Sequence, residues 1–357
     1  MILVNNAGDW NKTYAPLLHA EWHGCTPTDL VFPFFLFIVG VAIPFALASR
    51  RDAAASAAAR RQLHRKILRR AALLFALGLL GTFFPFYTVV LERVRIPGVL
   101  QRIALVYLGA AFAYLYLSPK ARAVLAASLL AFYWALMKLM PVPGFPLGDL
   151  SPQGNFAFWL DHQILGAHTW RFSPGPGDPE GILSTVPAWV TALCGIFCGE
   201  LLRTAEKLGI KLVKMLGWGA AASLLGLALD PFFPLNKNLW SPSYVVYTAG
   251  LALFGLAATL YLVDVVKLDA WARPFTIFGR NSILAFVGSG LFAKVLLVVC
   301  RWQEGEKTVT LQGWLYRNFY ATTFPDYVAS LAWALTIVFF WLAILTVLAR
   351  RNIYLKV

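Results

Sequence analysis

Nine apolar stretches, each close to the length of a membrane-spanning helix, constrain this chain more than any other feature of its sequence. A helix needs about 20 mostly apolar residues to cross a bilayer, whereas a helix of a soluble protein keeps a polar face. The composition agrees, because 59% of the residues are hydrophobic and only 13% are charged, against about 25% charged in an average soluble domain. We therefore predict an all-α fold, a polytopic transmembrane helical bundle. The predicted spans are residues 28–48, 70–91, 97–117, 122–140, 183–203, 212–229, 243–263, 275–300 and 327–349.

The formal net charge of +14 comes from lysine and arginine gathered in every second connection between the apolar stretches. Connections on the cytoplasmic side of membrane proteins are rich in these two residues. We therefore expect the basic connections and the C-terminus to be cytoplasmic, and we do not expect nucleic acid as a partner. The basic residues are Arg50, Arg51, Arg60, Arg61, Arg65, Lys66, Arg69, Arg70, Lys120, Arg122, Arg203, Lys207, Lys211, Lys214, Lys267, Arg273, Arg350, Arg351 and Lys356.

The remaining connections would lie on the opposite side of the membrane, and the first of them raises a difficulty. Only four residues precede Asn5, too few to cross a bilayer. We expect a truncated first helix, missing from this chain or lost to a late start codon, and the alternative is an N-terminus that only dips into the interface. Residues 1–357 are predicted to form a single transmembrane domain without a cleavable signal peptide. The opposite connections are 5–27, 92–96, 141–182, 230–242 and 301–326, and their tryptophans that suit an interfacial aromatic belt are Trp10, Trp22, Trp170, Trp240 and Trp314.

Reactive polar side chains are densest directly before the first complete span. Polar groups at a membrane boundary are costly unless they are solvated or paired, so their presence favours a function. Asp29 also has a structural interpretation, since Thr28 would cap the helix and an acid in its first turn suits the helix dipole. His19 and His23 are four residues apart, as zinc ligands on a helix are, but no third ligand with suitable spacing is near, and we predict no metal site. A histidine here is either solvated or, when a carboxylate orients it, a general base or nucleophile.

Five motifs follow one another along the chain. They are VNNAGDW…YAPLLHAEWHGCTPTDLVFPFFLFIVG, RIPGVLQRIALVY, DPEGILSTVPA, PLNKNLWSPSYVVYTAGLA and FTIFGRNSILAFV. Together they resemble the heparan-alpha-glucosaminide N-acetyltransferase family, including its shorter bacterial homologues. Members of this family take acetyl from cytosolic acetyl-CoA and pass it across the membrane to the amine of a terminal glucosamine. The resemblance implies the same activity here, with His19, rather than His23, as the catalytic histidine of the H-A-x-W-x-G motif and with catalytic roles for Asn5 and Asp29.

Two departures from the family pattern bear on this interpretation. The chain lacks the basic cytoplasmic segment and the S-L-D-x-x-R-G pattern of a full first helix, which agrees with the truncation expected above. It also lacks the large luminal domain of the animal lysosomal enzymes. We therefore expect a multi-pass protein in the lipid bilayer of a bacterial inner membrane, whose acceptor is an amino sugar or another glycan. Whether it forms a homodimer stays open.

Polar residues at the ends of the spans are the candidates for binding acetyl-CoA, whose phosphates would gain charge-assisted contacts with basic groups. Ionisable residues within a membrane usually face a cavity or a partner. The structural alternative is that Arg102 pairs with Glu180 or Asp178, and that the other basic groups anchor helices at the interface. The candidates are Arg102, Lys237, Asn238, Ser241, Arg273, Arg280 and Asn281.

The expected chemistry is acyl transfer by one of two routes. His19 deprotonates the acceptor amine, or it takes the acetyl group itself as an acyl-imidazole. Asp29 would select the tautomer of His19, and Asn5 would donate to the oxygen of the thioester carbonyl. Two rival functions stay open from the residues alone. One is a transporter of a small anion or sugar, which a helical bundle with buried polar residues also fits. The other is an inactive relative that lacks the first helix.

Overall fold

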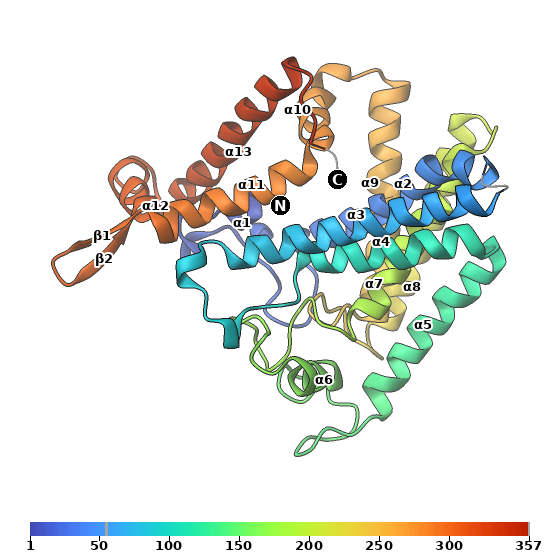
Figure 1. The fold of residues 1–357 in the computed structure, drawn as a ribbon, viewed down its shortest axis with the longest axis horizontal. Coiled ribbons are helices and arrows are strands. Elements are labelled where there is room, and N and C mark those ends of the chain that lie inside the picture. The colour runs from blue at the N-terminus through green and yellow to red at the C-terminus, as the bar shows by residue number, and fades with distance from the viewer. Residues whose placement is uncertain (54–55, 356–357) are drawn as a thin grey trace.

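The computed structural model describes residues 1–53 and 56–355 of the chain. Its regular structure is almost entirely helical, and long helices pack side by side with a short hairpin projecting from one end (Figure 1). The strands β1 (Arg301–Glu304) and β2 (Lys307–Thr310) form that antiparallel hairpin. The helices are α1 (Ile2–Asn5), α2 (Val31–Ala53), α3 (Ala57–Phe83), α4 (Val99–Tyr116), α5 (Pro119–Leu139), α6 (Phe156–Leu165), α7 (Thr185–Arg203), α8 (Leu208–Leu229), α9 (Pro242–Leu260), α10 (Asp269–Arg280), α11 (Ser282–Lys294), α12 (Leu311–Leu315) and α13 (Asp326–Arg350).

Eight helical segments in the described part of the chain are long and apolar enough to cross a membrane. They match eight of the nine predicted spans, and the predicted all-α polytopic membrane fold is confirmed. The predicted span 275–300 began too early, because residues up to Arg280 belong to the separate helix α10 and the apolar segment begins at Ser282. Two of them continue from an α-helix into a π-helical turn, after α9 and after α11. The eight segments are Pro27–Ser49, Val99–Tyr116, Pro119–Leu139, Thr185–Arg203, Leu208–Leu229, Pro242–Val265, Ser282–Val299 and Asp326–Arg350.

The predicted span 70–91 has a different form in the structure. The helix that contains it, α3, begins at Ala57 with a basic first half and ends at Phe83. Phe84 is extended (φ -82°, ψ 137°) because it precedes Pro85, and the residue before a proline is disfavoured in the helical region. The chain then passes through two short 3-10 turns before α4 begins at Val99. This irregular connection lies beside the candidate site.

Helices α2 and α7 cross with their backbones in contact, and glycine makes this possible. A Cβ atom on Gly40 would lie 2.0 Å from the carbonyl oxygen of Ala192, and one on Gly195 would lie 2.0 Å from that of Phe37. Small residues let helices in a membrane approach closely, and the packing that results holds them together. The start of α2, where the candidate site lies, is therefore supported by a closely packed helix pair.

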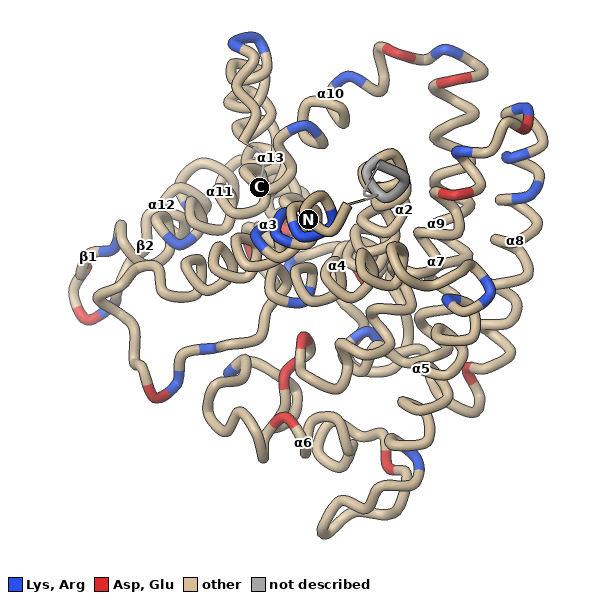
Figure 2. The backbone as a smooth tube through the Cα atoms, turned by 45° about the vertical axis from the view of Figure 1, so that its right-hand side comes forward, with Lys and Arg blue, Asp and Glu red and all other residues tan. Residues whose placement is uncertain are grey.

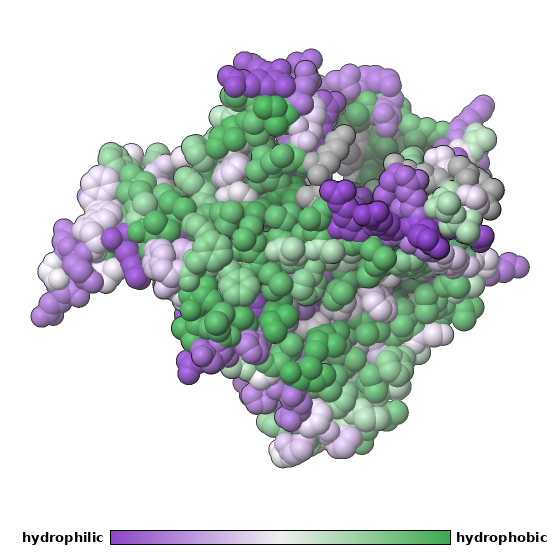
Figure 3. Space-filling view, in the orientation of Figure 1, coloured by the Kyte–Doolittle hydropathy of each residue, from purple (hydrophilic) through white to green (hydrophobic). Residues whose placement is uncertain are grey.

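The outer surface suits a lipid environment. Large hydrophobic side chains such as Val213, Leu224 and Phe339 are exposed along the spans. The face shown in Figure 3 is largely hydrophobic, with hydrophilic residues near its edges and over the basic first half of α3. Lysine and arginine lie mainly at helix ends and in connections (Figure 2). The orientation of the basic connections in the membrane stays a prediction. Trp240 is not part of a surface belt, because it is buried in the core and packs edge-on against Phe32.

Candidate active site

The carboxylate of Asp29 is held in place at the start of α2. The N–H group of Asp29 donates to the carbonyl of Thr26 at 3.0 Å, within the 3-10 turn Pro27–Leu30. Oδ2 of Asp29 accepts the N–H groups of Thr26 and Ala20, each at 3.0 Å. The hydroxyl of Tyr244 on α9 donates to the carbonyl of Asp29 at 2.5 Å. Asp29 is 1% exposed, and its other carboxylate oxygen, Oδ1, is left for a further partner.

The prediction that Thr28 caps this helix is wrong. Pro27 occupies the first position of the turn, so Thr26 is the capping residue. Proline suits that position because its missing N–H group would have no helical acceptor there. The hydroxyl of Thr28 donates instead to the carbonyl of Pro16 at 3.0 Å. This bond ties the start of α2 to the preceding N-terminal connection.

His19 is the partner of the free carboxylate oxygen. Its Nδ1 lies 2.6 Å from Oδ1 of Asp29. A carboxylate can only accept, so Nδ1 carries a proton, and in the neutral imidazole the lone pair is then on Nε2. The side chain of His19 is 46% exposed, whereas that of Asp29 is 1% exposed. The histidine can therefore meet a substrate while the acid stays shielded behind it.

Lys237 reaches the same pair from a position 218 residues further along the chain. Its Nζ lies 3.2 Å from each ring nitrogen of His19 and 3.9 Å from Oδ1 of Asp29. Burial lowers the pKa of Lys237, and nearby carboxylates oppose that change. The connection that carries it is anchored by Asn236, a buried residue whose amide donates to the carbonyl of Trp22 at 2.9 Å. A basic side chain thus lies in direct contact with the imidazole.

These side chains line a cavity of about 530 Å³, which we call the first cavity. Asn5 enters it from the end of α1 with an exposed side chain, for which the described residues provide no hydrogen-bond partner. Its amide is therefore available to a ligand. A volume of this size is typical of sites for small molecules. The predicted site residues at its wall are Asn5, His19, Asp29, Lys237 and Asn238, and the other polar residues there are Glu21, Thr28, Arg95 and Glu180.

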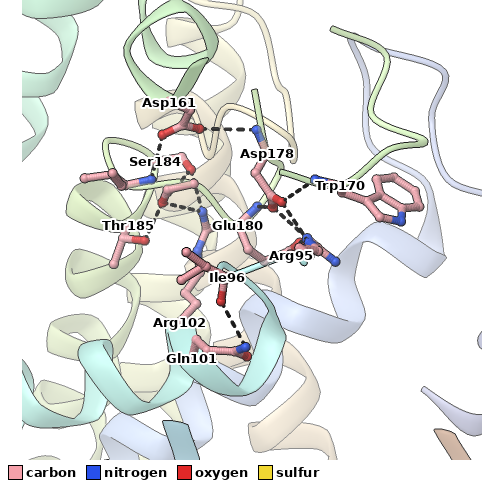
Figure 4. A network of polar contacts seen from close by, with 12 residues as sticks. Arg95, Ile96, Gln101, Arg102, Asp161, Trp170, Asp178, Glu180, Ser184 and Thr185 are labelled. Atoms are coloured by element: carbon pink, nitrogen blue, oxygen red, sulfur yellow. Dashed lines mark hydrogen bonds and ion pairs between the residues drawn. The ribbon is translucent and has the colours of Figure 1, made fainter. Parts of the chain in front are cut away.

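A network of ion pairs holds one wall of the first cavity (Figure 4). Arg95 donates from Nε and Nη2 to the two oxygens of Asp178, at 2.7 and 2.6 Å, and also pairs with Glu180. Burial opposes the charge of Arg95, but its bonds to these two acids raise its pKa above the usual value. Asp161 on α6 accepts the N–H groups of Asp178 and Ile182, at 3.3 and 2.9 Å, and burial raises the pKa of Asp161 to about 6. The segment 178–182 is thus fixed on both sides.

Known proteins resemble the chain across most of its length. Heparan-alpha-glucosaminide N-acetyltransferase of Homo sapiens is 31% identical over 348 residues, which are 82% of this chain and 51% of that protein. The protein of the same name from Mus musculus is 30% identical over 340 residues, which are 81% of this chain and 51% of that protein. This chain is a distant homologue of the heparan-alpha-glucosaminide N-acetyltransferases. It spans about half the length of the curated relatives it matches. Residues 13–137 also match a family described as a domain of unknown function, DUF5009.

In this N-acetyltransferase homologue the neighbours of His19 are less suited to catalysis. His23 does not line the first cavity, and its Nδ1 lies 3.3 Å from the amide of the buried Asn236. Burial lowers the pKa of His23. Burial also raises the pKa of Cys25 to about 12, so its thiol is protonated at neutral pH and is a poor nucleophile. Among these groups, only His19 combines an orienting carboxylate with access to the cavity.

Arg102 is buried and does not line the first cavity. Its guanidinium donates to the hydroxyl of Ser184. The structural alternative, that Arg102 pairs with Glu180 or Asp178, is not found among the described residues, and Arg95 forms the ion pairs with both acids instead. Arg95 belongs to the connection that faces the acidic segment, whereas Arg102 lies in the first turns of α4, inside the bundle.

Ser241, another predicted acetyl-CoA ligand, has a structural role. It is fully buried and caps α9, where its hydroxyl oxygen accepts the N–H group of Tyr244 at 3.4 Å. The same oxygen accepts the N–H group of Asn236 at 3.0 Å. Ser241 therefore supports the connection that carries Lys237 and does not itself line the first cavity.

The remaining predicted acetyl-CoA ligands lie on α10 or directly after it, and none of them lines the first cavity. Asn281 binds the C-terminal segment: its amide donates to the carbonyl of Ile353 at 3.2 Å, and its Oδ1 accepts the N–H group of Leu355 at 2.9 Å. Arg280 contacts the same segment, and Arg273 is exposed. Their role in binding acetyl-CoA stays a prediction that no contact with the first cavity supports.

Arg95 and Glu180, which line the cavity wall, were not among the predicted site residues. One signal was present, because the acidic motif DPE requires a cation and the motif RIPGVLQRIALVY offers Arg95 and Arg102. Spacing alone does not decide between these two arginines. The choice depends on where α4 begins and on how it packs against the other helices.

Proposed function

We propose that this protein transfers an acetyl group from acetyl-CoA to the amine of an amino sugar or another glycan, in the first cavity. The observation that carries the proposal is the hydrogen bond of 2.6 Å between a cavity-lining His19 and the buried Asp29. Homology to proteins named as N-acetyltransferases supports the type of reaction. A histidine oriented by a buried carboxylate is the arrangement that general base catalysis of acyl transfer uses.

His19 acts as the base through Nε2. The acceptor amine attacks the thioester carbonyl and gives a proton to Nε2 as the new C–N bond forms. The C–S bond then breaks, and the sulfur of coenzyme A leaves and takes that proton from His19. Asp29 stabilises the imidazolium present between the two proton transfers. The reaction needs no oxidant or reductant and returns His19 to its starting form.

Negative charge develops on the thioester oxygen during the attack, and two groups in the cavity can meet it. Asn5 offers an amide that the described residues leave without a partner. Lys237 offers Nζ, fixed 3.2 Å from the imidazole. Donors fixed in advance around such an oxygen contribute about 2.7–4 kcal/mol each to lowering the barrier. Asn238, at the same wall, is the predicted acetyl-CoA ligand that remains for positioning the donor.

The place of the cavity in the chain supports a reaction across the membrane. Four connections that the charge pattern assigns to the non-cytoplasmic side contribute residues to its wall. One residue from each is His19, Arg95, Trp170 and Lys237. The acceptor would bind from that side of a bacterial inner membrane. The acetyl end of acetyl-CoA would have to reach it through the bundle from the cytoplasm.

The test uses the purified chain in liposomes with acetyl-CoA, labelled in its acetyl group, and glucosamine. We expect N-acetylglucosamine and free coenzyme A in equal amounts. His19→Ala should abolish both, whereas His162→Ala, at an exposed histidine on α6, should change neither. Full activity in folded His19→Ala would overturn the proposal. Transport of unmodified sugar without product would favour the transporter, and label trapped on His19 without acceptor would replace direct transfer by the acyl-imidazole route.

A further inference from the structure

A second and larger cavity, of about 820 Å³, adjoins the first and has no part in the chemistry above. It extends between the C-terminal half of α3 and helix α11, beside the irregular connection that follows α3. The two cavities therefore meet along a shared set of side chains. The residues that line both cavities are Arg95, Val99, Trp170, Phe172 and Phe286.

The ionisable residues that line this second cavity in the described part of the chain are all basic. The charge of Arg95 is balanced by the acidic network of Figure 4. Arg93 and Arg171 are exposed, and no ion pair is found for either among the described residues. Lys294 donates to the carbonyls of Gly81 and Phe84, at 2.8 and 2.7 Å, and these are not anions. The second cavity therefore carries unbalanced positive charge, which suits a phosphate group.

The rest of the second cavity is largely apolar and lies at the outer surface of the bundle. Leu77 and Val287 line it, and Leu80 and Leu297, on the same helical segments, are 46% and 43% exposed. Figure 3 shows a largely hydrophobic face over α11 and the C-terminal half of α3. A hydrocarbon chain can enter there from the bilayer at little cost, whereas a hydrated sugar polymer would lose its contacts with water.

We propose that the second cavity binds the acetyl acceptor, and that this acceptor is an anionic amphiphile, an amino sugar joined through phosphate to a hydrocarbon chain. The inference rests on the proposed function, because it specifies the acceptor of the same site. The phosphate lies near Arg93 and Arg171, and the chain lies along α3 and α11. The sugar passes Arg95 and places its amine at His19, where the proton and the acetyl group move as described above.

The acceptor assay compares four compounds that separate the two features. They are glucosamine, glucosamine 1-phosphate, decyl glucosaminide and decyl glucosaminyl phosphate. We expect kcat/KM for decyl glucosaminyl phosphate to exceed that for each of the others by about tenfold or more, the ratio that one charge-assisted hydrogen bond provides. The difference should lie in KM, because the phosphate and the chain are remote from the reacting atoms.

Two variants test the two features in the chain itself. Arg93→Gln combined with Arg171→Gln should remove most of the preference for the phosphate. Gly81→Leu should remove the preference for the decyl chain, because Gly81 lines the second cavity and a Cβ atom there meets nothing within 4 Å. The matched controls are Gly217→Leu on α8, where a Cβ atom also meets open space, and Arg301→Gln on the hairpin. Neither should change the ratios of kcat/KM among the four compounds.

The outcomes separate this inference from the function beneath it. If the wild-type protein acetylates none of the four compounds, the proposed function fails and the inference fails with it. If it acetylates glucosamine as well as decyl glucosaminyl phosphate, only the inference is overturned. The inference is also overturned if Gly81→Leu and the double arginine variant keep wild-type ratios but lose a tightly bound phospholipid, because the second cavity then holds a structural lipid.

Discussion

Replacing Asp29 by asparagine tests the site most directly, because it keeps the shape of the side chain and exchanges one oxygen for a donor. Oδ2 of Asp29 faces the N–H groups of Ala20 and Thr26, each at 3.0 Å, and Oδ1 faces Nδ1 of His19 at 2.6 Å. An amino group turned toward the two N–H groups would leave both donors unsatisfied, at about 1–3 kcal/mol each. The asparagine should therefore keep its oxygen there and point its amino group at His19.

The imidazole must then change its tautomer. Nδ1 of His19 would accept from the asparagine, and the proton would move to Nε2, the atom proposed to take the proton of the amine. Loss of a general base costs about 10²- to 10⁴-fold, and a serine protease loses about 10⁴-fold from the corresponding change. We expect kcat of Asp29→Asn to fall by about 10³-fold, with KM and the melting temperature nearly unchanged, because the substrate contacts and the bonds to Ala20 and Thr26 persist.

The assay is steady-state acetylation of glucosamine by purified protein in liposomes, with thermal melting as the check on folding. Asp269→Asn, at an exposed acid in the first turn of α10, is the matched control and should keep wild-type kcat. A folded Asp29→Asn protein whose kcat stays within about threefold of wild type, a difference below 1 kcal/mol, would refute the tautomer argument.

Four further changes test other parts of the site. Lys237→Met should lower kcat by about 10²-fold without lowering the melting temperature, since burial opposes the charge of Lys237; an unchanged kcat would remove it from the mechanism. Arg95→Gln should cost about 3 kcal/mol of stability, because Asp178 is fully buried beside it, and a melting temperature equal to wild type would contradict the network. Gly181→Ala should lower stability by about 1–3 kcal/mol, because its Cβ atom would lie 1.8 Å from Oδ2 of Asp161, and a rise in melting temperature would refute that contact. The folded state favours protonated Asp161, whose pKa is raised by burial from its ordinary value of 3.8 to about 6. Wild type should therefore lose stability relative to Asp161→Asn as the pH rises from about 4 to about 6; melting curves whose difference does not change with pH would count against it.

The spans could be predicted because hydropathy over about 20 residues is a local property and membrane insertion depends on it directly. Two predicted spans differ in the structure. Span 70–91 was assigned on hydropathy although it contains Pro85, and α3 ends just before that proline. Span 275–300 ran the end of α10 together with α11, which the structure separates at Asn281. The same local chemistry places the cap one position earlier than expected, at Thr26 instead of Thr28, because proline occupies the first position of the turn.

The candidate site was only partly predictable. The family resemblance pointed to Asn5, His19 and Asp29, and the structure brings all three to one cavity. The predicted acetyl-CoA ligands divide: Lys237 and Asn238 lie at the same wall, whereas the others cap a helix, fill the core, bind the C-terminal segment or, in the case of Arg273, are exposed away from the cavity. Ligand-binding residues and structural residues are both polar and both occur at the ends of spans. A single sequence therefore does not show which polar residue faces a cavity and which one is buried in the packing.

By itself, the sequence determined that this chain is a helical membrane protein with a polar N-terminal cluster, because both follow from short stretches of residues. Tertiary structure alone decided that Lys237 contacts His19 across 218 positions of the chain, and that Arg95 rather than Arg102 binds Asp178. These contacts join connections that are far apart in the chain, and they form only when the packed helices bring those connections together; the close backbone approach at Gly40 is one example of that packing. Packing of this kind is a property of pairs of segments, and no single segment specifies it.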